Sequence, residues 1–228
     1  MLFDILYNQN YSAREGIIIF LIVLLAFFIS ITFHEFAHGY AAYKMGDLTP
    51  KLAGRLTLNP IKHMSPMGFF MFIFLRIGWA KPVPVNPMNF KRYRKGVRIV
   101  SLAGVGANFV LGLVAALIHL LLVNTVTVLN EPIFYLIMFL QYMMVVNSLL
   151  LMFNILPICP LDGFNFISSF CSADNKFVKA SIKNSGKIIL SVLLIAVLIE
   201  ILTGIDIWGT YLYLCYDFVF GKIAFIGV

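Results

Sequence analysis

The chain consists of long apolar stretches separated by short polar segments that contain proline, glycine and basic residues. About 20 apolar residues in a helix cross the roughly 30 Å hydrocarbon core of a bilayer. The pattern predicts transmembrane helices in five stretches, which cover residues 16–45, 99–123, 132–153, 188–203 and 207–226. We therefore expect an all-α polytopic membrane protein with about five transmembrane helices, organised as a single domain over residues 1–228.

The first apolar stretch is predicted to be one continuous helix. It runs without proline from Gly16 through Ser30 into His34, so it lacks the short apolar core and small-residue cleavage site of a signal peptide. Gly46 stands where a helix stop is expected. We therefore expect this helix to be retained, with ionisable residues near its C-terminal end.

The region between the first two long spans, residues 50–78, has a different pattern. Residues 51–60 alternate polar and apolar side chains around Gly54, which predicts a short β-hairpin-like segment. The apolar run 67–77 is too short to cross a bilayer, because about 11 helical residues cover only about half of its hydrocarbon thickness. We therefore expect a re-entrant or interfacial segment there, followed by a loop over residues 79–98.

Composition supports a membrane location and limits the candidate partners. Of the 228 residues, 61% are hydrophobic and 12% are charged, with a mean hydropathy of +0.94, whereas soluble proteins are about half apolar and a quarter charged. The net charge of +7 comes mainly from the segments 79–98 and 176–187, which is typical of cytoplasmic loops of membrane proteins. We expect a protein of the cell membrane in contact with the lipid bilayer, with no nucleic-acid partner.

The strongest chemical motif is His34-Glu35-Phe36-Ala37-His38 near the end of the first span. Two histidines four residues apart lie on one helix face and can bind one metal ion. Glu35 then lies beside the metal, where it can deprotonate an activated water. Ionisable residues in a membrane helix are costly and usually functional, although a buried polar cluster that pairs helices is the simpler alternative.

A catalytic zinc site normally has three protein ligands, so a third ligand is needed. The best candidate is Asp162, which follows an apolar span interrupted by Pro157 and Pro160. Broken helices at membrane depth are tolerated where they line a cavity or are buried in protein. Asp162 could instead cap the short helix that follows, which is a frequent role of aspartate.

Four segments together resemble the site-2 protease family of intramembrane zinc metalloproteases, in its compact prokaryotic form. These segments are His34–His38, Gly54–Pro60, Gly78–Pro87 and Asn154–Gly163. The resemblance covers nearly the whole chain. It has two departures, because this family usually has proline where Val105 and Cys159 stand here.

The resemblance implies a zinc endopeptidase that cleaves membrane-spanning protein substrates. One Zn²⁺ per chain would be bound by His34, His38 and Asp162, with Glu35 as the general base. The family would also place Asn108 near the metal, where its amide would help to hold the substrate or the developing oxyanion. Because basic loops favour the inside, we expect the active site to face the cytoplasmic side; if the run 67–77 were itself a crossing, the His34 end would lie opposite the basic loops.

Several alternatives stay open at this point. Gly104 and Asn108 also suit close helix packing. We expect His63 and His119 not to be ligands. The hairpin-like segment 51–59 and the re-entrant run 67–77 are the candidate sites where an extended substrate docks by adding a strand to an exposed edge. A metal-binding membrane sensor or a metal-ion transporter without proteolytic activity is the alternative function, because intramembrane histidine and aspartate also mark ion paths.

Overall fold

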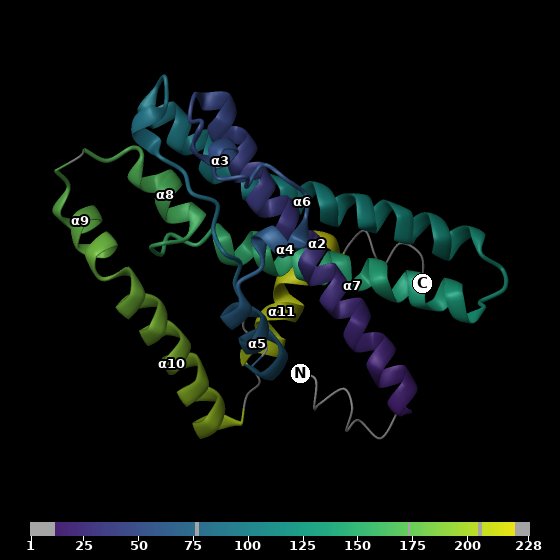
Figure 1. Ribbon diagram of the computed structural model, residues 1–228. Helices are drawn as coiled ribbons and strands as arrows, with labels where there is room; N and C mark the ends of the chain where they lie inside the picture. Colours follow the sequence, from purple (N-terminus) through teal and green to yellow (C-terminus); the bar gives the residue numbers. More distant parts are fainter. Residues whose placement is uncertain (1–11, 76–77, 173, 205–206, 222–228) are drawn as a thin grey trace.

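The computed structural model describes residues 12–75, 78–172, 174–204 and 207–221, and these residues are mostly helical (Figure 1). The elements in chain order are α2 (Ala13–Met45), α3 (Thr49–Leu52), α4 (Pro60–His63), α5 (Pro66–Leu75), the 3-10 turn η1 (Pro87–Asn89), α6 (Tyr93–Thr125), α7 (Glu131–Asn154), α8 (Asp162–Ser168), α9 (Lys176–Lys183), α10 (Ser185–Thr203), α11 (Ile207–Tyr216) and the π-helical turn η2 (Asp217–Gly221). The described residues contain no named β-strand. An isolated antiparallel bridge joins Met64 to Ala80.

Three of the described helices, α2, α6 and α7, are long and apolar enough to cross a membrane. Their outward faces are apolar as well. On α2, Ile17, Leu21 and Leu25 follow one another at one-turn spacing and are 52%, 55% and 52% exposed. Contiguous exposed apolar surface of this kind indicates contact with lipid rather than water. The protein is therefore a helical membrane protein.

The two predicted C-terminal spans are not confirmed as crossings among the described residues. Residues 188–203 are helical, within α10. The stretch 207–226 begins with α11 of 10 residues and continues into η2, and residues 222–226 lie outside the described part. A helix of this length covers about 15 Å, roughly half of the hydrocarbon core, so α11 alone is too short to cross.

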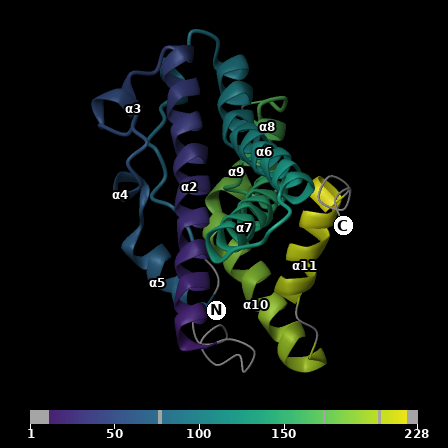
Figure 2. The same cartoon turned by 90° about the vertical axis from the view of Figure 1, so that its right-hand side faces the viewer.

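Helices α2, α6 and α7 pack against one another around the main apolar cluster, whose members include the fully buried Ala26, Ala116 and Met144. Small residues at such contacts allow helices to approach closely. Figure 2 shows α6 and α7 on one side of α2, with α3, α4 and α5 along its other side. Helix α8 packs on α6, and α11 packs on α7. α2 therefore lies between two layers, and residues from both can reach it.

The ends of α2 are defined by local sequence. Ser12 and Glu15 form a capping box, in which the Ser12 hydroxyl accepts from the Glu15 N–H and the Glu15 carboxylate accepts from the Ser12 N–H. Gly46 ends the helix with φ of 109°, a left-handed conformation that favours glycine. The 33 residues between them extend about 50 Å. Because this exceeds the hydrocarbon core of about 30 Å, the last turns have room to carry ionisable side chains at its edge.

The hairpin predicted at residues 51–60 is wrong. Residues Thr49–Leu52 form α3 with Pro50 in its first turn, and Pro60 begins α4 directly after the Asn59 cap. Proline has no N–H for a strand ladder but suits the first turn of a helix, and this preference outweighs the alternation of polar and apolar residues. The strand edge expected to dock a substrate is therefore absent from this segment.

The predictions for the run 67–77 and for the loop 79–98 differ in how well they match the structure. The apolar run 67–77 falls mostly in α5, whose 10 residues match the expected short helix; its depth in a bilayer stays a prediction, and residues 76–77 lie outside the described part. The predicted loop 79–98 is shorter than expected, since α6 already begins at Tyr93. No proline lies between Pro87 and position 99, so nothing prevents the basic residues before position 99 from joining the helix.

Candidate metal centre

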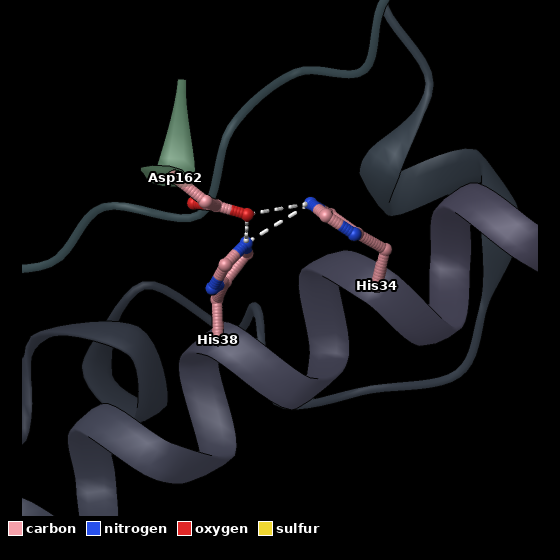
Figure 3. Close-up of side chains that lie close together, drawn as sticks. All are labelled: His34, His38 and Asp162. Carbon is pink, nitrogen blue, oxygen red and sulfur yellow. Dashed lines mark hydrogen bonds and ion pairs between the residues drawn. The ribbon is translucent and has the colours of Figure 1, made fainter. Parts of the chain in front are cut away.

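Two histidines near the C-terminal end of α2 point in the same direction (Figure 3). His34 and His38 are one helical turn apart, and their Nε2 atoms are 3.0 Å from each other. Their side chains are 8% and 12% exposed. The convergence predicted from the sequence spacing is confirmed.

Asp162 brings a carboxylate to the same point from another element, because it is the first residue of α8. Its Oδ2 lies 3.2 Å from Nε2 of His38 and 3.5 Å from Nε2 of His34. This buried oxygen has no hydrogen-bond partner among the described residues. The helix cap is Leu161, and no side chain caps the helix. The geometry thus favours the ligand role of Asp162 over the capping role.

These three residues fit a zinc ion in donor type and in geometry. Two ligand atoms, each about 2.1 Å from a tetrahedral zinc ion, lie roughly 3.4 Å apart, close to the three separations of 3.0, 3.2 and 3.5 Å found here. Electron-pair donors this close repel one another unless a cation lies between them. Among the described residues, His34, His38 and Asp162 form the group of His, Cys, Asp and Glu side chains with metal-ligand spacing.

Each imidazole ring is held from behind through its Nδ1 atom. Nδ1 of His38 lies 2.8 Å from the backbone carbonyl oxygen of Val100, and Nδ1 of His34 lies 2.6 Å from Oδ1 of Asn108. Carbonyl and amide oxygens accept hydrogen bonds, so both rings donate from Nδ1. The Nε2 lone pairs are then directed at the metal position, the usual arrangement of metal-binding histidines.

Glu35 is positioned by the extended segment that follows α5, which comprises residues 78–86. The N–H of Val83 donates to Oε2 of Glu35 over 2.8 Å. That segment is itself anchored on both sides: Lys81 donates its N–H to the His63 carbonyl over 2.8 Å, and its own carbonyl accepts from the buried Arg55 side chain. The orientation of the Glu35 carboxylate therefore depends on a loop backbone.

Asp47 fixes the later part of this segment to the end of α2. Its Oδ1 accepts from the Asn89 side chain over 2.8 Å and from the Thr49 N–H over 3.0 Å, while Oδ2 accepts from the Asn86 N–H over 2.7 Å. Burial opposes ionisation of this carboxyl, but the hydrogen bonds from Thr49, Asn89 and Asn86 prevail and lower the pKa of Asp47. A charged, fully bonded side chain thus secures the loop that contacts Glu35.

A cavity of about 450 Å³ adjoins the metal site. His34, Glu35 and His38 form part of its wall, together with Asp162. The extended segment forms another part through Pro82, Val83 and Val85, and Pro87 at the start of η1 adjoins them. A cavity of this size matches typical ligand-binding pockets of a few hundred Å³, and its position leaves the metal site open on one side.

Asn154 and Asn108 differ in whether they line this cavity. Asn154 lines it, whereas Asn108 is not among the described residues of its wall. Asn108 is fully buried, and both ends of its amide are bonded, to His34 and to Asn147. The structure therefore brings Asn108 to the metal site as predicted, but behind a ligand rather than facing a substrate.

Gly104 of α6 lies directly against both imidazole rings. A Cβ atom at this position would come within 3.0 Å of Nε2 of His38 and of Cε1 of His34, a distance that real Cβ atoms essentially never show. The packing role expected for Gly104 is thus specific, because the absence of a side chain makes room for the metal ligands.

The other histidines lie away from this site, as predicted. Nε2 of His63 lies 2.7 Å from the Thr57 carbonyl oxygen, and burial lowers the pKa of His63. Nε2 of His119 lies 3.3 Å from the Gln141 amide nitrogen. Both therefore serve contacts between neighbouring segments.

Sequence reasoning missed several residues that support the site. Asn147 and Ser30 are fully buried on α7 and α2, and a signal existed for both, because polar residues inside apolar spans usually have a partner. Asp47 directly follows a predicted helix end and belongs to no recognisable motif. The Val83 N–H is a backbone group and leaves no side-chain signal.

Relatives of this chain carry provisional assignments as zinc metalloproteases. YwhC of Bacillus subtilis (strain 168) is 38% identical over 149 residues, which cover 64% of this chain and 67% of YwhC. Rip2 of Mycolicibacterium smegmatis is 31% identical over 185 residues, covering 78% of this chain and 68% of Rip2, and Rip2 of Mycobacterium tuberculosis (strain ATCC 25618 / H37Rv) is 28% identical over 188 residues with the same coverage. No family model and no solved structure matches the chain.

The chain matches these relatives over about two thirds of their own length. The donor set of two histidines and one aspartate is that of a zinc enzyme. The chain therefore belongs to the site-2 protease-like family of zinc metalloproteases.

Proposed function

We propose that this protein is an intramembrane endopeptidase, which hydrolyses peptide bonds within or near transmembrane segments of membrane-protein substrates. The observation that carries the proposal is the convergence of three metal-ligating atoms beside Glu35, on the wall of a cavity at the end of a membrane-capable helix. His34, His38 and Asp162 would hold the zinc ion. The provisional assignments of the relatives support the proteolytic part of the proposal.

Zinc, when bound, supplies a Lewis acid that polarises the scissile carbonyl and makes water more acidic. Glu35 is the general base in this proposal. Its Oε2 accepts the Val83 N–H, which restrains the carboxylate and leaves Oε1 to take the proton from the attacking water. The same proton can then be delivered to the leaving amine.

The amide expected to face the developing oxyanion is better assigned to Asn154 than to Asn108. Asn154 lines the cavity, and its Nδ2 donates one hydrogen to the Leu150 carbonyl over 2.9 Å. A second N–H remains for a substrate oxygen. Amide donors aimed at a developing negative charge are a common form of transition-state stabilisation.

The proposed substrate binds as an extended peptide. A helix hides its carbonyl groups in hydrogen bonds between residues four apart, so a transmembrane substrate must unwind locally before cleavage. The extended segment with Val83 and Val85 forms one wall of the cavity, which supports a binding mode in which the substrate lies alongside it.

The proposed orientation has the active site on the cytoplasmic side of the cell membrane. The C-terminal end of α2 and the N-terminal end of α6 are joined by a hydrogen bond of 3.0 Å from the Lys91 N–H to the Met45 carbonyl. Arg92, Arg94 and Lys95 lie at that same end. Clustered basic residues next to membrane spans favour the cytoplasmic side.

The proposal is tested by comparing wild type with Glu35→Gln in detergent and in liposomes, measuring zinc content and cleavage of a single-span test substrate. We expect both proteins to bind about one zinc ion per chain, as a site with three protein ligands should, and only wild type to cleave. Glu131→Gln is the matched control, because it makes the same change at an exposed carboxylate outside the cavity.

Two outcomes contradict the proposal in different ways. If both proteins bind zinc and neither cleaves any of a broad panel of single-span substrates, the metal site stands but a membrane sensor or metal transporter explains it better. If neither binds zinc, the site itself is not a metal centre.

A further inference from the structure

A line of buried polar side chains runs behind His34 and joins the three packed helices. Ser30 comes from α2, Asn108 from α6 and Asn147 from α7, and all three are fully buried. Nδ2 of Asn108 donates to Oδ1 of Asn147 over 2.8 Å, and Nδ2 of Asn147 donates to Oγ of Ser30 over 2.8 Å. The line ends at Nδ1 of His34, 2.6 Å from Oδ1 of Asn108.

Two backbone carbonyls fix the direction of the hydrogen bonds in this line. Nδ2 of Asn147 also donates to the Met143 carbonyl over 2.8 Å, and Oγ of Ser30 donates to the Ala26 carbonyl over 2.8 Å. A carbonyl oxygen can only accept. The amide nitrogen of Asn147 must therefore face Met143 and Ser30, and its oxygen must face Asn108.

The orientation of Asn147 also determines the tautomer of the metal ligand His34. Because Asn147 presents an oxygen, Asn108 must turn its NH₂ group toward Asn147 and its own oxygen toward His34. Nδ1 of His34 must then carry the hydrogen, and the lone pair of the neutral ring lies on Nε2. Nε2 is the atom that points at Asp162 and His38.

Resting on the zinc site of the proposed function, we propose that Asn147 is a positioning residue for metal binding. It selects the amide orientation of Asn108, and through it the tautomer and ring angle of His34. The hydrogen bonds of Asn147 go to Asn108, Ser30 and the Met143 carbonyl rather than to a metal ligand, and Asn147 is not among the described residues of the cavity wall. Loss of such outer support typically lowers metal affinity by about 10–100-fold.

The competing explanation is that Asn147 only holds helices together. Its neighbour Ser148 offers a matched comparison, since it is also fully buried on α7 and donates only to the Met144 carbonyl of its own helix, over 2.8 Å. A purely structural role predicts that substitutions at both positions affect stability and leave zinc affinity alone. The positioning role predicts that zinc affinity falls for Asn147 and not for Ser148.

The test measures the zinc dissociation constant of the full-length protein in detergent by competition with a chelator, together with thermal unfolding of the zinc-free protein. We expect Asn147→Leu to weaken zinc binding about 10–100-fold and Ser148→Ala to stay within about twofold of wild type. If Asn147→Leu does not fold, Asn147→Ser replaces it. A serine there can donate to Met143, as Ser148 does to Met144, but cannot reach Asn108.

A rescue variant separates orientation from packing. In Asn108→Asp, both side-chain oxygens can accept from His34, so the orientation no longer depends on Asn147. We expect the double variant Asn108→Asp with Asn147→Leu to bind zinc at least about fivefold more tightly than Asn147→Leu alone, in the manner of carboxylate–histidine–zinc groups. A lost packing contact would not be restored by a change on another helix.

Equal zinc affinity of wild type and Asn147→Leu, or of Asn147→Leu and the double variant, overturns the inference. These readouts do not require proteolysis. A wild type that binds zinc but cleaves nothing counts against the proposed function, while the affinity differences still decide the role of Asn147. A wild type without zinc affinity overturns both.

Discussion

The two histidines of the metal centre both donate from Nδ1 and keep the Nε2 lone pair for the metal, but they donate to different kinds of acceptor. His38 donates its Nδ1 hydrogen to a backbone carbonyl, that of Val100, over 2.8 Å. His34 donates to the side chain of Asn108 over 2.6 Å, and that amide is oriented by a second side chain, Asn147. One support is part of a helix backbone, whereas the other is a series of side chains from three helices.

The two ligands are therefore sensitive to different substitutions. No side-chain substitution removes the Val100 carbonyl, so His38 is protected as long as α6 keeps its place. His34 depends on the identity of Asn108 and, in our inference, of Asn147. Burying two amides among apolar helices costs free energy unless they are fully bonded, so the pairing in this line also makes the packing of α2, α6 and α7 specific.

Gly104→Ala should have the largest effect, because it disturbs both histidines equally. The new Cβ would lie within 3.0 Å of ring atoms of both residues, and neither ring can move away without leaving the ligand position. We expect zinc affinity to fall at least about 100-fold, the upper end of the cost of disturbed ligand support, and cleavage to be lost. Zinc titration of the purified variant checks this.

Gly106→Ala is the control, since a Cβ there meets no atom within 4 Å. It makes the same substitution two positions along α6. Wild-type zinc affinity in Gly104→Ala would mean that the two rings have more freedom than their packing indicates.

The comparison also separates what the sequence could predict from what it could not. His34, Glu35, His38 and Asp162 were predictable because they are side chains in a recognisable spacing. Asn108 was predicted to lie near the metal and to hold the substrate or the oxyanion, whereas it lies behind His34 and away from the described cavity wall. The sequence could not show this, because it depends on which way the amide faces. The Val100 carbonyl and the Val83 N–H carry no side-chain signal, so no sequence pattern identifies them.

The fold shows the same division. The three long helices were predicted within three residues at every end except the start of α6, because burial in lipid requires long apolar runs. The segment 51–60 was predicted incorrectly as a hairpin because alternation was weighed above the prolines at its two ends. Pro50, just before it, and Pro60 both stand in the first turn of a helix. Helix α6 begins at Tyr93 rather than at residue 99, because the basic residues before the apolar run are compatible with a helix that extends beyond it.

Asn108→Leu should break the support of one histidine and spare the other. We expect zinc affinity to fall about 10–100-fold. Nitrogen-15 NMR of the imidazole rings should show that His34 loses its Nδ1–H form while His38 keeps it. Asn124→Leu makes the same change on an exposed part of α6, where the amide donates only to the Leu120 carbonyl. Equal changes at both histidines would show that their supports are not independent.

Asp47→Asn tests the support of Glu35. The Val83 N–H, which donates to Glu35, lies in a loop that Asp47 fixes through the Asn86 N–H. The variant loses the anion that accepts from Thr49, Asn86 and Asn89. We expect stability at neutral pH to fall by about 1–3 kcal/mol and cleavage to fall about tenfold or less through the Val83 contact. Zinc affinity should change little, because no metal ligand bonds to this loop.

The pH dependence of this loss has a defined sign. The pKa of Asp47 lies below its ordinary value of 3.8, so its contribution to stability is complete above that pH and disappears as the pH falls through the lowered pKa. The stability gap between wild type and Asp47→Asn should therefore close below about pH 4. Asp174→Asn, at a side chain 94% exposed, is the control; a gap that persists in acid would assign the loss to packing.

Arg98→Lys should give the smallest effect, because it tests the third ligand, whose position comes from the docking of α8 on α6. The Arg98 guanidinium lies 3.9 Å from the centre of the Phe170 ring, and its Nε donates to Oγ of Ser169 over 3.2 Å. Lysine keeps the charge but loses the flat stacking surface and this geometry. We expect a stability loss of about 0.5–1 kcal/mol and a zinc affinity weaker by about two- to fivefold, which corresponds to the same free energy. Asp162 is the first residue of α8, and Arg98 contacts the other end of this helix through Ser169. An unchanged zinc affinity would therefore mean that the start of α8 keeps its position without the Arg98 contacts. In that case the carboxylate, like His38, would owe its position to its immediate backbone.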